Sequence, residues 1–547
     1  MDQFRAGRRP HTAAVTVTTV VVAQLLAVAI CLLGLWAGLP PWAAALVAAI
    51  PCAALFVRIG GRLPLAWAEA AWHFVRGRRP DIGHGKDFHS PGETVGLHWV
   101  DGQVLAVVEL LPPPRSWTRM TRETCESPEQ LPLAALAGCL EQNDVSLSGI
   151  DVVSHGSRAV AGTPAADVYD ALVGPLPAAA QRIVWVVLRF DASTNAASVA
   201  RRGGGVDGAS RTLAVAARRV IRALADAGYR SRSLSAAEID SACARICRGV
   251  HPNAMGQEWD HVPLAGVRNV GNAVAPHRLT QELLTGVWSA PSLGTTVALR
   301  LRPAPNPGTV QVGAAFRRTV RAEPERLELP GLVSTQGRHR DALLAHLPAS
   351  SPDLDDLTPM SAVTPEQLDA LRLPVAGCGQ LVGSDAHGHA VTARITGPGV
   401  TNVYVAGELY LAQQLVFRAV ATGARVLVRT DRPHAWRMLV ESVATPMRLR
   451  TAHESSRSET GFDTIVVDGV PVPPARAGVT TVHVHSDPRM WPPTAPDVAI
   501  VQPGASGDRV VLTVGDQRVD LALVTITSET AFVGRPVGPP AGLAAVR

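Results

Sequence analysis

The longest apolar stretch of the 547-residue chain lies close to its N-terminus. Between Arg9 and Arg58 there is no Lys, Arg, Asp or Glu, and Pro40-Pro41 marks a plausible turn within this stretch. About 20 apolar residues cross the roughly 30 Å hydrocarbon core of a bilayer. The pattern therefore predicts a transmembrane hairpin, with one helix over residues 14–39 and a second, shorter helix over 42–59.

A secretory signal peptide is the competing interpretation of this stretch. Its apolar region normally has about 7–15 residues and ends at a small-residue cleavage site. Here the first apolar run is longer and a second one follows at once, so the hairpin is favoured. The second helix holds Pro51 and offers small residues suited to close helix packing. These small residues are Ala45, Ala48, Ala49, Ala53 and Ala54.

Charge predicts the orientation of the hairpin. Residues 1–86 carry nine basic and three acidic side chains, whereas the rest of the chain carries 42 basic and 43 acidic ones. Arginines precede and follow the hairpin and none lies in its turn, so the positive-inside rule places both termini in the cytoplasm. The arginines concerned are Arg5, Arg8 and Arg9 before the hairpin, and Arg58, Arg62, Arg76, Arg78 and Arg79 after it.

An aromatic segment follows the hairpin. Residues 63–79 hold Trp67, Trp72 and Phe74 among small apolar residues and end in a basic cluster. This composition predicts a helix that lies along the inner leaflet. A continuation of the second membrane helix is the alternative. Under either interpretation, the remaining chain is a cytosolic body tethered by two helices.

Strand and helix periodicities alternate along the first half of this body and predict a mixed α/β fold. Two hairpins are expected, one with the turn Asp101-Gly102 and one through residues 303–308. Ser235 and Glu238 are spaced as a capping box that opens a helix. The expected strands are 94–100, 103–110, 150–154, 183–190, 229–234, 295–302 and 309–318, and the expected helices are 131–140, 167–172, 209–227 and 236–247.

A segment rich in Pro, Ser, Asp and Thr, residues 348–370, is expected to be a linker. Beyond it, strands over 402–406, 425–429 and 464–467 alternate with helices over 409–421 and 433–443 and predict a parallel, Rossmann-like sheet. The predicted domains are the tail and hairpin (1–62), the juxtamembrane helix and linker (63–92), a first α/β domain (93–347), the linker (348–370) and a second α/β domain (371–547).

Composition narrows the possible functions. Lys86 is the only lysine, and the first glycine of a P-loop ending there would fall at Pro80, so a P-loop, a Schiff-base lysine and a Ser-x-x-Lys nucleophile are excluded. A body without a basic excess argues against nucleic-acid binding. The seven cysteines are irregularly spaced and predict reduced thiols, not a disulfide framework.

Two glycine motifs have a possible role in nucleotide binding. Gly203–Gly208 matches G-x-G-x-x-G, but a dozen residues separate it from the preceding strand, so a flexible loop before a helix is favoured. An anion at this helix N-terminus, aided by Arg201 and Arg202, stays open as an alternative. The first strand of the second domain is followed by a single glycine, Gly407. The next residue, Glu408, is acidic and stands where a phosphate would bind.

Several groups of metal-binding side chains also occur, and none forms a complete ligand set. Zinc needs a fourth ligand and usually closer pairs, and we find no carboxylate pattern beside the histidine pairs. Core thiols, surface histidines and a linker position are the favoured interpretations. The groups are Cys243, Cys247 and His251; His387 and His389; His483 and His485; and Asp353-Leu354-Asp355. We therefore assign no catalytic, cofactor-binding or metal-binding residue and expect no cofactor.

The order of several short segments behind the hairpin is specific. The segments are 95–110, 150–154, Gly174-Pro175-Leu176-Pro177, 184–191, Arg201-Arg202-Gly203-Gly204-Gly205 and 234–239. Over roughly residues 10–300 this order resembles EccE, the membrane component of the type VII (ESX) secretion system. The part after about residue 370 resembles the longer members of that family.

The resemblance implies a subunit of an actinobacterial plasma-membrane complex that also contains EccB, the ATPase EccC and EccD. It implies a peripheral position and a cytosolic part with a glycosyltransferase-like fold and no known activity. The expected function is thus structural and non-catalytic. The alternative is a membrane-tethered enzyme that binds a nucleotide or nucleotide sugar, and only the α/β character and the glycine-rich loop support it.

Overall fold

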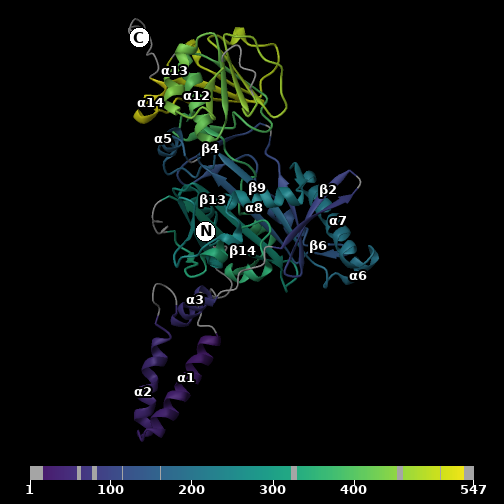
Figure 1. Cartoon of the computed structure of the whole chain (residues 1–547), viewed down its shortest axis with the longest axis vertical. Coiled ribbons are helices and arrows are strands. Elements are labelled where there is room, and N and C mark those ends of the chain that lie inside the picture. Colours follow the sequence, from purple (N-terminus) through teal and green to yellow (C-terminus); the bar gives the residue numbers. More distant parts are fainter. Residues whose placement is uncertain are drawn as a thin grey trace.

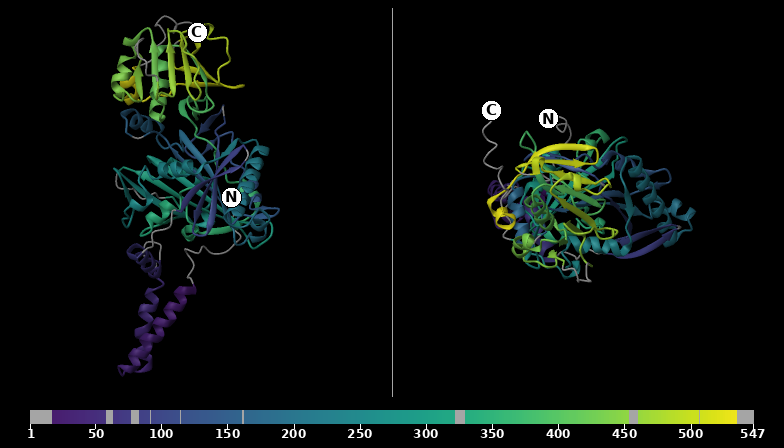
Figure 2. Two further views of the ribbon diagram at one scale, coloured as in Figure 1. Left: turned by 45° about the vertical axis from the view of Figure 1, so that its right-hand side comes forward. Right: turned by 90° about the horizontal axis from the view of Figure 1, so that it is seen from above.

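A computed structural model describes most of the chain, with gaps at both ends and between segments. Three parts follow one another along the long axis: a pair of apolar helices, a body built on one large sheet, and a second sheet at the far end (Figures 1 and 2). The mixed α/β prediction is confirmed. The described residues are 17–57, 63–76, 83–90, 92–113, 115–160, 162–321, 329–452, 460–505 and 507–534.

The apolar helices α1 (Val17–Trp36) and α2 (Pro41–Ala54) lie side by side as an antiparallel pair. Within the described residues one helix, over Thr19–Trp36, is long and apolar enough to cross a membrane. With 14 residues, α2 is about 21 Å long at 1.5 Å per residue. The predicted helix pair is therefore present, but only α1 has the length of a span.

Small side chains form the contact between α1 and α2. Ala44 and Ala48 of α2 are 1% and 3% exposed, and a Cβ placed on Gly34 of α1 would lie 3.0 Å from the Cβ of Ala44. The Cys52 thiol donates to the carbonyl of Ala23 at 3.3 Å. Of the small residues predicted for helix packing, Ala48 faces α1, while Ala45, Ala49, Ala53 and Ala54 are exposed.

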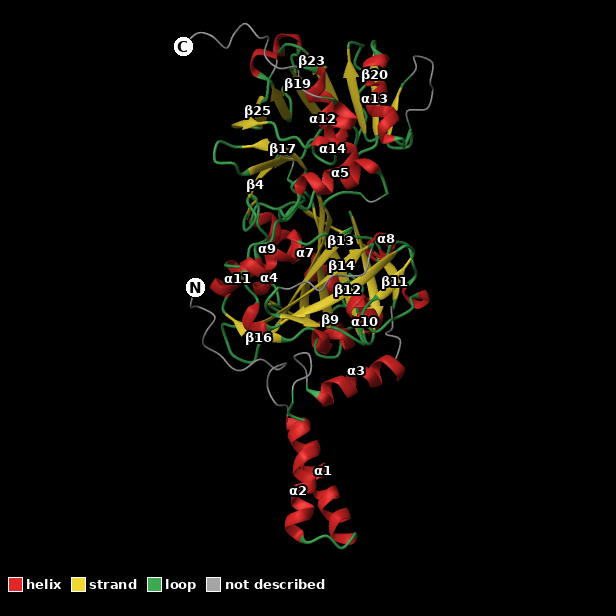
Figure 3. Cartoon of the chain, turned by 90° about the vertical axis from the view of Figure 1, so that its left-hand side faces the viewer, coloured by secondary structure: helices red, strands yellow, loops and turns green. Residues whose placement is uncertain are grey.

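A separate helix, α3 (Pro64–Arg76), lies between the helix pair and the body (Figure 3). The prediction of a separate helix is confirmed, and the alternative of a continuous membrane helix is wrong because α2 ends at Ala54. Trp67 stacks on Trp259 of the body with ring centroids 6.0 Å apart, and Phe74 meets the same ring edge-on at 5.5 Å. Two of the aromatic side chains expected at the membrane surface therefore contact protein instead.

The middle part of the molecule is built on a sheet in which all strand pairings among the described residues are antiparallel. Both predicted hairpins are confirmed, and Asp101 and Gly102 turn the first with φ of 44° and 77°. In spatial order the strands are β1 (His84–Ser90), β2 (Glu93–Val100), β3 (Gln103–Leu110), β9 (Gln181–Asp191), β8 (Gly149–Ser157), β13 (Gly294–Pro303), β14 (Val310–Val320), β12 (Val267–Val274) and β11 (Val262–Leu264). The glycosyltransferase-like fold implied by the resemblance gains no support.

Helices cover both faces of this sheet. One apolar core lies under α4 (Leu133–Gly138), α7 (Gly205–Asp226) and α9 (Gln281–Ser289), and another lies under α8 (Ala236–Ile246) and α10 (His339–Leu344). The capping box predicted for α8 is present, because Glu238 accepts the N–H of Ser235 at 2.9 Å and the Ser235 side chain accepts the N–H of Glu238.

The segment expected to be a linker, residues 348–370, packs on the first sheet. It contains β16 (Met360–Val363), which pairs with β14, and α11 (Pro365–Asp369), whose buried Leu368 belongs to the first core. Leu354 is also buried, in the core under α8 and α10. The Pro, Ser, Asp and Thr residues that suggested a linker form turns and caps, such as the capping box of Thr364 and Gln367.

The second sheet begins with six parallel strands, which confirms the predicted parallel unit. Their order is β21 (Leu449–Thr451), β20 (Val426–Thr430), β22 (Thr464–Asp468), β23 (Thr480–His485), β19 (Asn402–Ala406) and β24 (Val498–Val501), followed by antiparallel β25 (Arg509–Val514), β26 (Gln517–Ala522), β17 (Gln380–Ser384), β18 (Ala390–Ala393), β4 (Trp117–Met120) and β5 (Cys125–Glu126).

Two early segments of the chain join this second unit. β4 pairs with β18, and α5 (Pro164–Val173) packs on α12 (Leu409–Thr422), which shares its core with α13 (Pro433–Val443) and α14 (Thr527–Val533). The chain thus passes between the two sheets several times, which ties the second unit to the first.

Candidate functional site

Charged side chains lie inside three apolar strands of the first sheet. Asp151 of β8, Arg189 of β9 and Arg300 of β13 are 3%, 1% and 1% exposed. Because side chains alternate between the faces of a strand, these three point toward the face covered by α8 and α10, while their neighbours fill the opposite core. Asp151 lies directly opposite Arg300 in the register. The sheet itself therefore brings the charges together.

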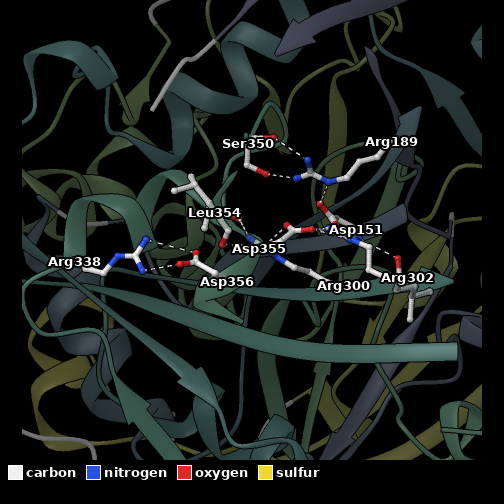
Figure 4. A network of polar contacts seen from close by, with 11 residues as sticks. Asp151, Arg189, Arg300, Arg302, Arg338, Ser350, Leu354, Asp355 and Asp356 are labelled. Atoms are coloured by element: carbon white, nitrogen blue, oxygen red, sulfur yellow. Dashed lines mark hydrogen bonds and ion pairs between the residues drawn. The ribbon is translucent and has the colours of Figure 1, made fainter. Parts of the chain in front are cut away.

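Asp151 is the centre of the resulting network (Figure 4). Its Oδ2 accepts from Arg189 Nε at 2.6 Å, and its Oδ1 accepts from Arg302 Nη1 at 2.6 Å. Burial raises the pKa of this carboxyl, but the guanidinium groups of Arg189, Arg302 and Arg300 together hold it well below its usual range. Gly149 leaves room for Arg302, because a Cβ there would collide with the guanidinium.

The network holds the segment that follows α10, through Ser350 and Asp355, against the sheet. Arg189 donates to the carbonyl of Ser350 at 3.0 Å and to its hydroxyl at 2.5 Å. Asp355 accepts from Arg300 and, at 2.8 Å, from Arg302 Nε. At the edge of the network, Arg338 donates to Asp356 at 2.8 Å (Figure 4). The site thus joins three strands to a distant segment by ion pairs.

This arrangement changes the interpretation of the Asp-x-Asp motif at 353–355. Asp355 lies on the first sheet and not in a free linker, and two guanidinium groups contact its carboxylate. A cation would meet positive charge on that side. The structure therefore assigns Asp355 to a structural ion-pair network.

This network was not predicted from the sequence, although the sequence contains a signal for it. Asp151, Arg189 and Arg300 each stand between two apolar residues of a predicted strand. A charge buried without a partner is very unfavourable, so charges at such positions indicate partners nearby. Asp355 could not be predicted as a partner from the sequence, because its position depends on how a distant segment of the chain packs on the sheet.

The Gly203–Gly208 loop opens α7 but does not follow a strand, because α6 (Ala196–Arg201) lies between it and β9. The arginines considered for anion binding contact Asp144, with Arg202 Nη2 at 2.6 Å and Arg201 Nη2 at 3.4 Å. The hydrogen bond from Arg202 is the largest influence that lowers the pKa of Asp144 to about 2. Asp144 therefore offsets part of the positive charge beside the loop, and it also pairs with Arg219 at 3.3 Å.

The turn after β19 is also filled. Gly407 has φ of 151°, and a Cβ there would collide with the side chain of Gln502. Gln502 is 2% exposed, and its Oε1 accepts the N–H of Glu408 at 2.8 Å. The place where a Rossmann fold holds a phosphate is therefore occupied by a side chain.

The carboxyl edge of the parallel strands is the usual ligand site of an open α/β sheet. Here Asp468, at the end of β22, accepts hydrogen bonds from Arg432 at 2.6 Å and from Trp436 Nε1 at 2.8 Å. Burial raises the pKa of Asp468, and these donors together with Thr430 bring it below its usual value. This carboxylate is held by its own neighbours.

Cys243, Cys247 and His251 are not brought together as one cluster. Cys247 is fully buried, whereas Cys243 and His251 line a cavity of about 590 Å³. His98 and Asp240, which the sequence analysis did not single out, also line it, with Nε2 and Oδ1 3.1 Å apart. Burial raises the pKa of the Cys243 thiol to about 12, so it stays protonated at neutral pH.

The two histidine pairs differ in their surroundings. His483 packs edge-on against Tyr404, with ring centroids 4.8 Å apart, and burial lowers its pKa to about 4. His387 and His389 lie in the turn between β17 and β18 with their rings stacked at 5.7 Å. Asp385 lies beside them. The expectation that no carboxylate accompanies this pair is wrong.

Comparison with known proteins agrees on one family. The family model described as "Putative type VII ESX secretion system translocon, EccE" matches residues 178–274. The ESX-1 secretion system protein EccE1 of Mycolicibacterium smegmatis is 28% identical over 369 residues, which are 66% of this chain and 71% of that protein. The ESX-5 protein EccE5 of Mycobacterium marinum is 28% identical over 50% of this chain and 69% of its own length.

A further match extends into the second unit. The ESX-2 secretion system protein EccE2 of Mycobacterium tuberculosis is 24% identical over 507 residues, which are 86% of this chain and 90% of that protein. The described structure is that of a mixed α/β protein with an N-terminal apolar helix. The resemblance to EccE of type VII secretion is confirmed by the family model and by these relatives.

Proposed function

We propose that this chain is a structural, membrane-anchored subunit of a type VII (ESX) secretion complex. The observation that carries the proposal is the EccE match over residues 178–274, joined in one chain to the apolar helix α1. The relatives are named as ESX secretion system proteins. EccB, the ATPase EccC and EccD are the proposed partners, and the large α/β body lies at the periphery of the machine.

The role is proposed to be non-catalytic. At each of three candidate ligand sites, the polar groups already have partners within the chain. Asp144 contacts the arginines beside the glycine loop, Gln502 fills the turn after β19, and Asp355 is paired with arginines. A nucleotide-binding enzyme would instead require groups directed at a ligand. These contacts favour the structural role over the alternative.

Membrane insertion is proposed to involve both α1 and α2, with both termini in the cytoplasm and the complex in the bacterial plasma membrane. α3 then lies on the inner leaflet, with Trp72 and Val75 exposed on the side away from Trp259. Arg76 stacks over the ring of Trp72 at 4.5 Å, which places a cation beside lipid phosphates. Apart from Arg76, the arginines on which the orientation rests lie outside the described residues.

Reporter fusions test this topology. Fusions at Asp2 and at Arg547 are both expected to report a cytoplasmic location. The arginines before and after the helix pair favour the same, cytoplasmic side of the membrane, and the turn between the helices has none. A fusion in the turn beside Pro40 should report the opposite side of the membrane and serves as the internal control. A periplasmic signal from Arg547 would show that the chain crosses the membrane an odd number of times and would overturn the topology.

Purification of the intact complex tests the function. A tagged full-length chain, extracted in mild detergent, is expected to co-purify with EccB, EccC and EccD, as identified by mass spectrometry. Deletion of its gene should then abolish export of ESX substrates. If the purified chain carries none of the three subunits, the structural role is contradicted. A rise in melting temperature with a nucleotide or nucleotide sugar would favour the enzyme instead.

A further inference from the structure

The turn between β17 and β18 brings together Asp385, His387 and His389. Their sequence pattern is Asp-x-His-x-His. One ligand atom from each residue lies within 4.8 Å of the other two. Asp385 is 9% exposed, whereas His387 is exposed and His389 half-buried. The group therefore has a fixed carboxylate at its base and imidazoles reaching toward solvent.

Asp385 organises this turn with one carboxylate oxygen and leaves the other for a different partner. Its Oδ1 accepts the N–H groups of His387 and His389, both at 2.9 Å. Its backbone N–H donates to the carbonyl of His389 at 2.9 Å. These bonds fix the backbone of the turn and the carboxylate, so Asp385 and the Cα atoms of both histidines are positioned before any ligand arrives.

The second oxygen of Asp385 faces a ring nitrogen. Oδ2 lies 3.4 Å from His389 Nδ1, and neither of these two buried atoms makes a hydrogen bond of normal geometry among the described residues. Arg119 Nε of β4 makes an ion pair with Oδ2 at 3.0 Å. In the tautomer in which Nδ1 carries no proton, this nitrogen and Oδ2 face each other with lone pairs, which is the arrangement of two ligand atoms around a cation. Ligand atoms on a tetrahedral zinc ion lie about 3.3 Å apart, given bonds of about 2.0–2.1 Å.

We propose that Asp385, His387 and His389 form a binding site for a divalent transition metal ion, with Zn²⁺ as the ion of choice. Two imidazoles and one carboxylate suit Zn²⁺ and disfavour Mg²⁺ and Ca²⁺, which prefer oxygen ligands. Three protein ligands leave a fourth position open to water or to a side chain of another molecule. The ion adds a positive charge next to Arg119, so Arg119 opposes binding.

Zinc titration of the full-length protein in detergent, first stripped with a chelator, tests this site. The parent protein is expected to bind one Zn²⁺ that the His387→Asn variant binds at least tenfold more weakly and the His387→Asn/His389→Asn variant does not bind. His434→Asn, which removes an exposed histidine of α13, is the matched control and should behave as the parent. His387 is exposed, so its replacement leaves the fold intact.

Two further arms make the test specific. Arg119→Gln should tighten Zn²⁺ binding several-fold, because it removes the opposing cation, and Mg²⁺ should not compete. Glu258, Asp260 and His261 form a second such group, and any Zn²⁺ that binds there also binds to the His387 and His389 variants. Equal Zn²⁺ binding by the parent and the double variant would overturn the proposal. So would weaker binding by Arg119→Gln.

Discussion

The Asp151→Asn variant is expected to lose about 3–5 kcal/mol of unfolding free energy in the first unit, because it leaves two buried arginines and the partly buried Arg302 with one carboxylate fewer. Arg189 and Arg302 each donate to Asp151 at 2.6 Å, and Arg300 lies opposite it. The amide keeps the shape of the side chain, so the loss is one of charge. For a unit of this size the melting temperature should fall by roughly 6–20 °C.

A matched control separates burial from ion pairing. Asp167→Asn removes the carboxylate that contacts Arg321 at 2.9 Å, but both side chains of this pair are about half exposed. An exposed pair contributes about 0–1 kcal/mol, so this variant should melt within about 4 °C of the parent. If both variants melt alike, the network does not stabilise the fold as argued.

The pH dependence gives an independent check on Asp151. Its pKa is lower in the folded protein than in the unfolded chain, so the folded state binds fewer protons. Its stabilisation is fully present above the unfolded-state pKa of about 4 and is lost as the pH falls toward the folded-state value. The difference in stability between the parent and Asp151→Asn should therefore be constant near neutral pH and shrink below about pH 4.

Much of the secondary structure was predictable, because local patterns determine it. Helix α13 spans Pro433–Val443 as predicted, and the capping box at Ser235 is formed by neighbouring residues. The strand order was not predictable. β4 pairs with β18 across about half of the chain, and β16 adds to the first sheet from within the expected linker. Such pairings depend on tertiary packing, which local periodicity does not contain.

The candidate sites show the same limit at the level of side chains. The pair His387 and His389 was recognised, yet Asp385 was overlooked, although it stands two residues earlier in the sequence. Its role became visible only with the turn, which directs one carboxylate oxygen at the histidines. Arg201 and Arg202 were predicted beside the glycine loop, but their partner Asp144 is more than fifty residues away.

Replacement of residues 17–57 by an unrelated two-helix hairpin of the same topology is expected to remove the protein from the purified secretion complex. Hydrophobicity does not drive helices together in lipid, so association there needs close packing of small residues. Ala44 and Ala48 already pack against α1. Ala45, Ala49 and Ala53, spaced four residues apart, form a second row of small residues that stays exposed.

A finer variant tests that second row. Ala49→Leu/Ala53→Leu adds bulk to the exposed row and leaves the contact with α1 intact, so the co-purified EccB, EccC and EccD should fall at least tenfold. Ala54→Leu makes the same chemical change on the row that already carries Leu46 and Ile50, and it should have no effect. Membrane fractionation confirms that every variant stays at the membrane. Normal co-purification of the swapped hairpin would mean that the helices are a passive anchor, and the contact would then lie on the α/β body.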